Sequence, residues 1–328
     1  MLRKISARSA IVTLLGITLA LGGCTSKKKD YEGLQVLRTP IKDEVKSLDP
    51  ANAYDSVSLD VLPNITETLY QYEWNNNANA LIPLLASEMP TFSKDRLTAT
   101  IKIKKGIRFS DDAAFKATNG KGRELKAGDF VYAIKRLVHP GVQSNGSWIF
   151  EGRLKGFSEF QKTLREAPKD QLAKIFEDGQ IEGLKATDDY TLTFTFVKPY
   201  PLLTHMLSMT FTAPMASEVV AAYQDERGQV NEKPVGTGPF VLEKWERGHE
   251  LVLGKNTNFR GDAAPTSMGA DAGKPLPFLD KLVFQIMKEE QPMWLNFQKG
   301  ELEIGRIPKD SYSQAIGSAG GLNEELKK

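Results

Sequence analysis

The sequence predicts a mixed α/β or α+β protein with more than one lobe. Several stretches alternate apolar and polar residues with the two-residue period of a half-buried strand, and segments with helical spacing lie between them. The 328 residues suffice for one large or two medium domains. A composition of 41% hydrophobic and 26% charged residues is ordinary for a globular protein and argues against wholesale disorder.

The predicted strands alternate cleanly in the sequence. They are residues 97–104, 190–197 and 279–287, together with a hairpin of 240–245 and 250–253. In the first, Leu97, Ala99, Ile101 and Ile103 share one face, and threonines and lysines share the other. Pro199 follows the second strand and stops it, because proline cannot donate to a sheet ladder.

The predicted helices carry apolar residues three or four positions apart. They cover residues 58–70, a segment around Phe130–Leu137, and 157–176, which Pro168 interrupts. Strands and helices mix without strict βαβ alternation, and no internal repeat is found. By composition, residues 75–79, 113–122 and 261–274 are expected to be loops or linkers.

The N-terminus predicts an exported lipoprotein. A cationic start precedes the uncharged, mostly apolar run Ile11–Leu21, which is too short to span a membrane but has the size of a signal-peptide core. Gly22, Gly23 and Cys24 follow and resemble the bacterial lipobox, so residues 1–23 are expected to be removed and Cys24 lipidated. Residues 24–34 then form a lipidated tether. The alternative is a buried free cysteine in a cytosolic protein.

The single cysteine and the charge balance exclude some classes of protein. One Cys allows no intrachain disulfide. The formal net charge is +2, but residues 1–23 hold three of the 43 bases and none of the 41 acids, so the remainder carries −1. No basic surface for nucleic acid follows from this balance.

Signals for catalysis or cofactors are weak, so we expect no enzyme, no cofactor and no metal site. None of the three histidines stands in a zinc-binding spacing. The sequence holds no GxSxG nucleophile motif and no P-loop. Several acidic pairs, such as Asp111-Asp112 and Glu243 with Glu246, are interpreted as solvated surface acids.

Four sequence blocks together resemble the family 5 extracellular solute-binding proteins, the oligopeptide, dipeptide and nickel-complex receptors of ABC importers. The blocks are SLDP at 47–50 with ITETLY at 65–70, IPLLASEMPTFSKDRLTATIKIKKGIRF at 82–109, GDFVYAIKRLVHP at 128–140, and VGTGPFVLEKWERGHELVLGKNTN at 235–258 continued by FLDKLVF and KGELEI. They stand in family order across residues 47–304. Departures include an insertion before Glu124 and the absence of a Ser or Thr N-cap before Asp129.

The resemblance implies a periplasmic-binding-protein-like (type 2) clamshell of α/β class. Its first lobe would be residues 35–74 and 181–300, with an inserted subdomain at 75–180 and the start of a second lobe at 301–328. Because the chain stops 24 residues after the KGELEI block, the second lobe is expected to be largely missing, as in a fragment. The alternative is a relative that functions with one lobe.

The resemblance also implies candidate ligand-binding residues. After SLDP the family's loop turns into the cleft, at positions matched by Tyr54, Asp55 and Ser56; for Tyr54 a partly exposed loop residue is the alternative. Trp148 stands where the family presents an aromatic side chain to its ligand. Gly236 and Gly238 are expected to adopt positive φ in a turn beside the cleft. Asp310 lies where the second lobe begins and either faces ligand or is a surface acid.

The expected function is that of a lipid-anchored, extracytoplasmic substrate-binding protein of an ABC importer, with peptides as the expected solute. Its expected partners are a peptide or other small solute, the permease subunits and a bacterial membrane, and it is expected to be a monomer. One alternative is an envelope lipoprotein that reuses the fold for adhesion, signalling or assembly. A hydrolase hidden in the cleft is another.

Overall fold

The computed structural model describes residues 31–73, 79–317, 320–324 and 326 of the chain. The predicted signal peptide, Cys24 and the loop at 75–78 therefore lie outside the described residues. Residues 33–328 form one compact unit. Among the described residues, no helix is both long enough and apolar enough to cross a membrane.

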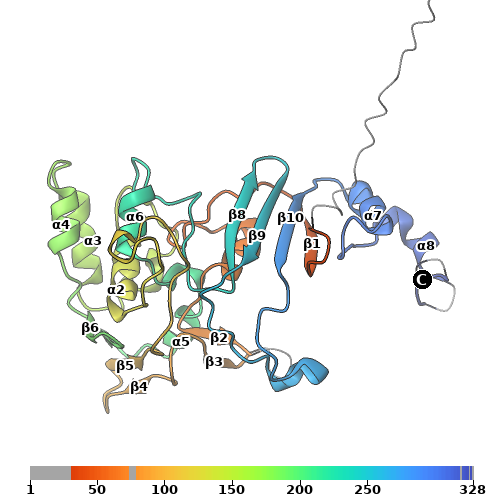
Figure 1. Ribbon diagram of the computed structural model, residues 1–328. Coiled ribbons are helices and arrows are strands. Elements are labelled where there is room, and N and C mark those ends of the chain that lie inside the picture. Colours follow the sequence, from red (N-terminus) through yellow and green to blue (C-terminus); the bar gives the residue numbers. More distant parts are fainter. Residues whose placement is uncertain (1–30, 74–78, 318–319, 325, 327–328) are drawn as a thin grey trace, which may run out of the picture. The chain divides into compact units, whose positions relative to one another are not determined.

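The first sheet joins strands from both ends of the chain (Figure 1). Its order is β1-β10-β9-β8, with bounds Val36–Ile41, Lys281–Ile286, Glu250–Lys255 and Phe240–Glu246. β1 pairs with β10 in parallel, and the other pairs are antiparallel. The predicted hairpin is confirmed, and its turn contains Gly248 at φ 72°.

A second, antiparallel sheet has the order β4-β5-β7-β6. These strands are Thr91–Phe92, Thr98–Lys102, Thr191–Thr195 and Leu184–Asp188. The predicted alternation holds in β5 and β7, where Ala99, Ile101, Leu192 and Phe194 are buried. A short hairpin pairs β2, Tyr70–Tyr72, with β3, Leu81–Pro83.

In the part of the chain that the structure describes, eight short α-helices accompany the sheets. They are α1 Ser56–Val61, α2 Ala127–Arg136, α3 Phe157–Glu166, α4 Leu172–Asp178, α5 Leu203–Met206, α6 Ser217–Tyr223, α7 Glu290–Gln298 and α8 Tyr312–Ala315. At the start of α2, the carboxylate of Asp129 accepts a hydrogen bond from the backbone N–H of Lys126, which supplies the cap that the sequence left in question. Pro168 separates α3 from α4, as predicted.

The helix predicted over residues 58–70 is wrong in extent. α1 ends at Val61, and a single 3₁₀ turn, Leu62–Asn64, follows. Pro63 has no backbone N–H and cannot continue the α-helical ladder. The chain then straightens, so that Tyr70 begins β2 and not another helical turn.

The described residues of this unit form two hydrophobic cores. One is built around the second sheet and α2, from Ala51 to Val230, and the other around the first sheet, from Ile41 to Phe284. β6 and β7, assigned by sequence to the first lobe, pair in the same sheet as β4 and β5 of the inserted subdomain. The sheet therefore crosses the boundary predicted at residue 180, and the division into lobes stays a prediction.

Candidate functional site

The SLDP loop is held by a buried carboxylate. Asp49 is fully buried, and its oxygens accept hydrogen bonds from the backbone N–H groups of Ala51 and Val230 at 2.9 Å. These bonds tie the loop to a segment almost two hundred residues further along the chain. The loop that leads to Tyr54 therefore starts from a rigid frame.

The cationic partner of Asp49 is Arg136, the last residue of α2. Its Nη1 and Nη2 each lie 2.8 Å from one oxygen of Asp49, and Nη2 also donates to the carbonyl of Gly228 at 2.6 Å. Burial alone would lower the pKa of this guanidinium, but the hydrogen bonds and the charge of Asp49 outweigh it, so the pKa of Arg136 is raised. The bidentate pair fixes both distance and orientation between the loop and α2.

Tyr54 lies beyond this frame with its ring accessible. The side chain is 62% exposed, and its ring stacks on buried Phe211 with centroids 6.1 Å apart. A second loop reaches the same aromatic residue, because a Cβ added to Gly146 would lie 2.5 Å from the ring of Phe211. Two residues further on, Trp148 is 44% exposed on a 3₁₀ turn. The structure thus brings the loops of Tyr54 and Trp148 together at Phe211.

Asp55 and Ser56 have different surroundings. Asp55 is the N-cap of α1: its carboxylate accepts from the backbone N–H of Ser58 at 3.0 Å and from its hydroxyl at 2.7 Å. This pairing orients the start of the helix. Ser56 is the exposed first residue of α1. Of the two, Ser56 is the one exposed to solvent, two residues after Tyr54 in the chain.

The expectation of positive φ at Gly236 and Gly238 is wrong. Neither residue has a left-handed backbone; both are pressed against the backbone of Ile65. A Cβ would lie 2.1 Å from the Ile65 carbonyl oxygen at position 236 and 2.7 Å from it at position 238. The Gly238 N–H donates to that same oxygen at 2.9 Å. The glycines therefore permit a close backbone approach between two segments.

Asp310 stands apart from the other candidates. It is exposed on the 3₁₀ turn Lys309–Ser311. Within the part of the chain that the structure describes, no hydrogen bond or ion pair joins it to another predicted site residue. The geometry adds no support to a ligand contact at this position.

A cavity of about 920 Å³ that was not predicted from the sequence lies beside the β2–β3 hairpin. Its walls include Tyr72, Lys104, Pro239, Phe259 and Phe278, and none of the predicted site residues lines it. Glu67, from the ITETLY block, also lines it and is held by both terminal nitrogens of Arg260 at 2.7 and 2.8 Å. Its size falls within the range of small-molecule sites, which makes it a second candidate site.

A protein-family model matches most of the chain. The model of the bacterial extracellular solute-binding proteins, family 5, matches residues 80–326, so the chain belongs to this family of solute-binding proteins. The resemblance carried by the four sequence blocks is thereby confirmed, and so is the fold class that it implied. Family 5 is a family of extracellular binding proteins, and its match covers α2 and three strands of the first sheet, β8, β9 and β10, but not β1.

Individual curated relatives match most of this chain at low sequence identity. A dipeptide-binding protein of Lactococcus lactis is 27% identical over 301 residues, which are 92% of this chain and 48% of the relative. The periplasmic murein peptide-binding protein MppA of Escherichia coli is 26% identical over 287 residues, 86% of this chain and 45% of its own. The chain thus spans about half the length of the curated relatives it matches.

Solved structures show the same fold. The pheromone receptor PrgZ superposes with a TM-score of 0.65 at 24% identity, covering 86% of this chain and 48% of the receptor. OppA of Listeria monocytogenes, solved with bound peptide, gives 0.63 at 21% identity, with 86% and 48% covered. At sequence identities this low, the structural similarity shows the fold alone.

Proposed function

We propose that this chain supplies one wall of the ligand site in a peptide-binding receptor of an ABC importer. The observation that carries the proposal is the family match, because it joins the chain to solute-binding proteins over most of its length. Relatives named as binding dipeptides and murein peptides support a peptide as the solute. The proposed partners are the permease subunits of the importer, and the proposed place of action is outside the cytoplasm.

The surface around Tyr54 suits this role physically. A receptor for peptides of varied sequence takes its affinity from backbone groups and from aromatic rings that accept many side chains. Tyr54 offers a ring face and a hydroxyl, and Phe211 supports the ring from behind. The buried pair of Asp49 and Arg136 holds the loop in place before ligand arrives, which lowers the ordering cost of binding.

Replacing Tyr54 or Trp148 by Ala is expected to weaken peptide binding by roughly 1–3 kcal/mol each, as loss of an aromatic anchor does. Binding of tri-alanine and of a defined mixture of longer peptides would be followed by calorimetry. Both side chains are substantially exposed, so the thermal midpoint is expected to change little. Circular dichroism would verify that the fold is intact.

Tyr72→Ala is the matched control, because this tyrosine is 51% exposed but lines the 920 Å³ cavity. The affinity of Tyr72→Ala for peptide is expected to equal that of the parent chain. Weaker binding in Tyr72→Ala together with unchanged binding in Tyr54→Ala would move the ligand site to the cavity.

We further propose that Cys24 carries the lipid that anchors the receptor. Cys24→Ser is expected to abolish incorporation of labelled palmitate in a bacterial host, because the chain has no other thiol. Thr25→Ala, one residue further on, is the control and is expected to keep the label. Equal labelling of Cys24→Ser and the parent chain would contradict the lipoprotein assignment.

A further inference from the structure

The turn of the β8–β9 hairpin places two acids opposite one another. In the register of the hairpin, Glu246 pairs with Glu250, so two carboxylates project from directly opposed positions. Like charges in this arrangement destabilise a sheet. The chain offsets them with the ammonium of Lys244, which lies 2.8 Å from a Glu246 oxygen and 3.1 Å from a Glu250 oxygen. A cation is thus held between the two acids.

His249 adds an imidazole to the same cluster. Its Nδ1 lies 3.5 Å from Oε2 of Glu246. One ligand atom from each of Glu246, His249 and Glu250 can be chosen so that all three lie within 4.8 Å of one another. Two carboxylates and an imidazole are donors that a divalent transition metal accepts, and the three side chains would draw closer together to reach one ion.

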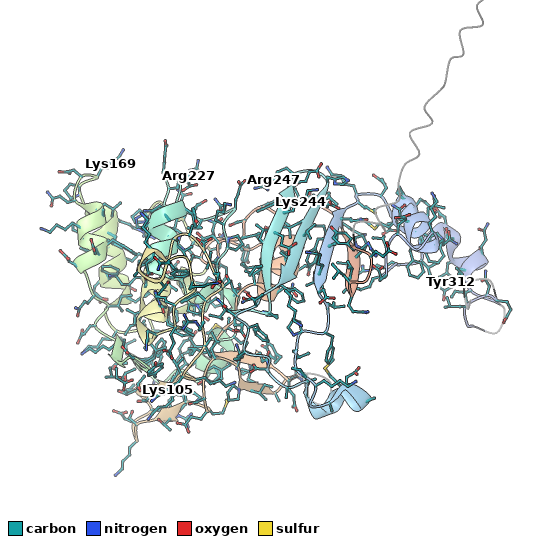
Figure 2. All side chains as sticks on the ribbon, in the orientation of Figure 1. Lys105, Lys169, Arg227, Lys244, Arg247 and Tyr312 are labelled. Carbon is teal, nitrogen blue, oxygen red and sulfur yellow. The ribbon has the colours of Figure 1, made fainter. Side chains whose placement is uncertain are left out.

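The backbone that carries these side chains is firmly held. Glu44 accepts hydrogen bonds from the Gly248 N–H at 2.7 Å and from the indole N–H of Trp245 at 3.1 Å. Arg247 donates to the carbonyl of Val45 at 2.8 Å, and the His249 carbonyl accepts from the backbone of β10 at 2.9 Å. Figure 2 shows Lys244 and Arg247 at this end of the hairpin. Donors on a rigid turn need little reorganisation to bind an ion.

We propose that Glu246, His249 and Glu250 bind a divalent transition metal ion, for which Zn²⁺ is the best fit, and that the Lys244 ammonium occupies the cation position until the metal displaces it. Imidazole favours Zn²⁺ over Ca²⁺ and Mg²⁺, which take oxygen ligands. Three protein ligands leave a fourth position for water. The sequence did not reveal the site, because EKWERGHE lacks a familiar zinc spacing and the acids meet only through strand register.

Metal titration of the full chain in detergent tests the proposal, in a Cys24→Ser background so that the thiol cannot bind. Co²⁺ absorption and Zn²⁺ competition with a chromogenic chelator are expected to show one equivalent bound, with Mg²⁺ and Ca²⁺ unable to compete. His249→Ala and Glu246→Gln are expected to weaken Zn²⁺ binding by more than ~10-fold, since even outer partners of a metal site are worth that much. Glu243→Gln, a carboxylate on the same strand outside the cluster, is the matched control and is expected to bind normally.

Lys244→Met distinguishes a metal site from chance surface binding. With the competing ammonium gone, the affinity for Zn²⁺ is expected to rise roughly fivefold, in line with the loss of exposed ion pairs. No binding by the parent chain, unchanged Co²⁺ spectra in His249→Ala, or an unchanged affinity in Lys244→Met would each overturn the proposal.

Discussion

Arg136→Met is expected to lower the free energy of unfolding by roughly 3–5 kcal/mol, the cost of leaving one partner of a buried ion pair unpaired. The methionine fills most of the volume of the arginine, so the effect comes mainly from charge. Asp49 would remain fully buried without its guanidinium, and the Gly228 carbonyl would lose its donor. Urea denaturation followed by circular dichroism would measure the change.

Arg227→Met is the matched control, since Arg227 is exposed and is labelled near α6 in Figure 2. Its replacement is expected to change stability by less than about 0.5 kcal/mol. The double variant Asp49→Asn with Arg136→Met should recover part of the loss, because no charge is then buried and the amide oxygen still accepts a backbone N–H. Equal effects of Arg136→Met and Arg227→Met would show that the buried pair contributes nothing specific.

Gly236→Ala is expected to destabilise the protein by about 3 kcal/mol, at the upper end of the range for overpacking. The new methyl group would lie 2.1 Å from the Ile65 carbonyl oxygen, a distance at which one of the two backbones must move. That movement would also strain the adjacent hydrogen bond from the Gly238 N–H to Ile65. Denaturant midpoints at constant m-value would report the loss.

Gly128→Ala provides the comparison with opposite sign. Gly128 lies in the first turn of α2, has no positive φ, and a Cβ there would meet nothing within 4 Å. Alanine should therefore stabilise the protein by about 0.4–1 kcal/mol, through reduced freedom of the unfolded chain. If both glycine variants had the same stability, close approach to Ile65 would not be the reason for glycine at position 236.

Local pattern was sufficient for much of the secondary structure. β5 and β7 lie within the segments predicted from alternation. The prediction succeeded because one face of each strand is buried and the other is more exposed to solvent. The short helices α5 and α6 were not predicted, since four to seven residues carry too little periodicity. The parallel pairing of β1 with β10 could not be predicted either, because the local sequence pattern of a strand does not specify a partner strand so far along the chain.

In the candidate site, too, the residues that stand in or beside a motif could be predicted, whereas the contacts between distant segments could not. Tyr54 could be located because a motif precedes it, and Asp49 and Arg136 each stand in a motif. Their pairing joins positions 87 residues apart, which only the fold reveals. The glycine motif was recognised but its reason was misread, because the closeness of Ile65 is tertiary. The 920 Å³ cavity was missed because its lining comes from several separate segments.

The pairing of β1 with β10 has a consequence for the order in which the protein folds. Next to this pair, the backbone N–H of Gln35 donates a hydrogen bond to the carboxylate of Asp280, 245 residues away. Closing so long a loop costs entropy before any contact compensates for it, and it slows folding. The core from Ala51 to Val230 can condense as soon as its own residues are available, whereas β1, synthesised first, must wait for β10. Among the strands that the structure describes, the first to be synthesised is therefore expected to be one of the last to pair.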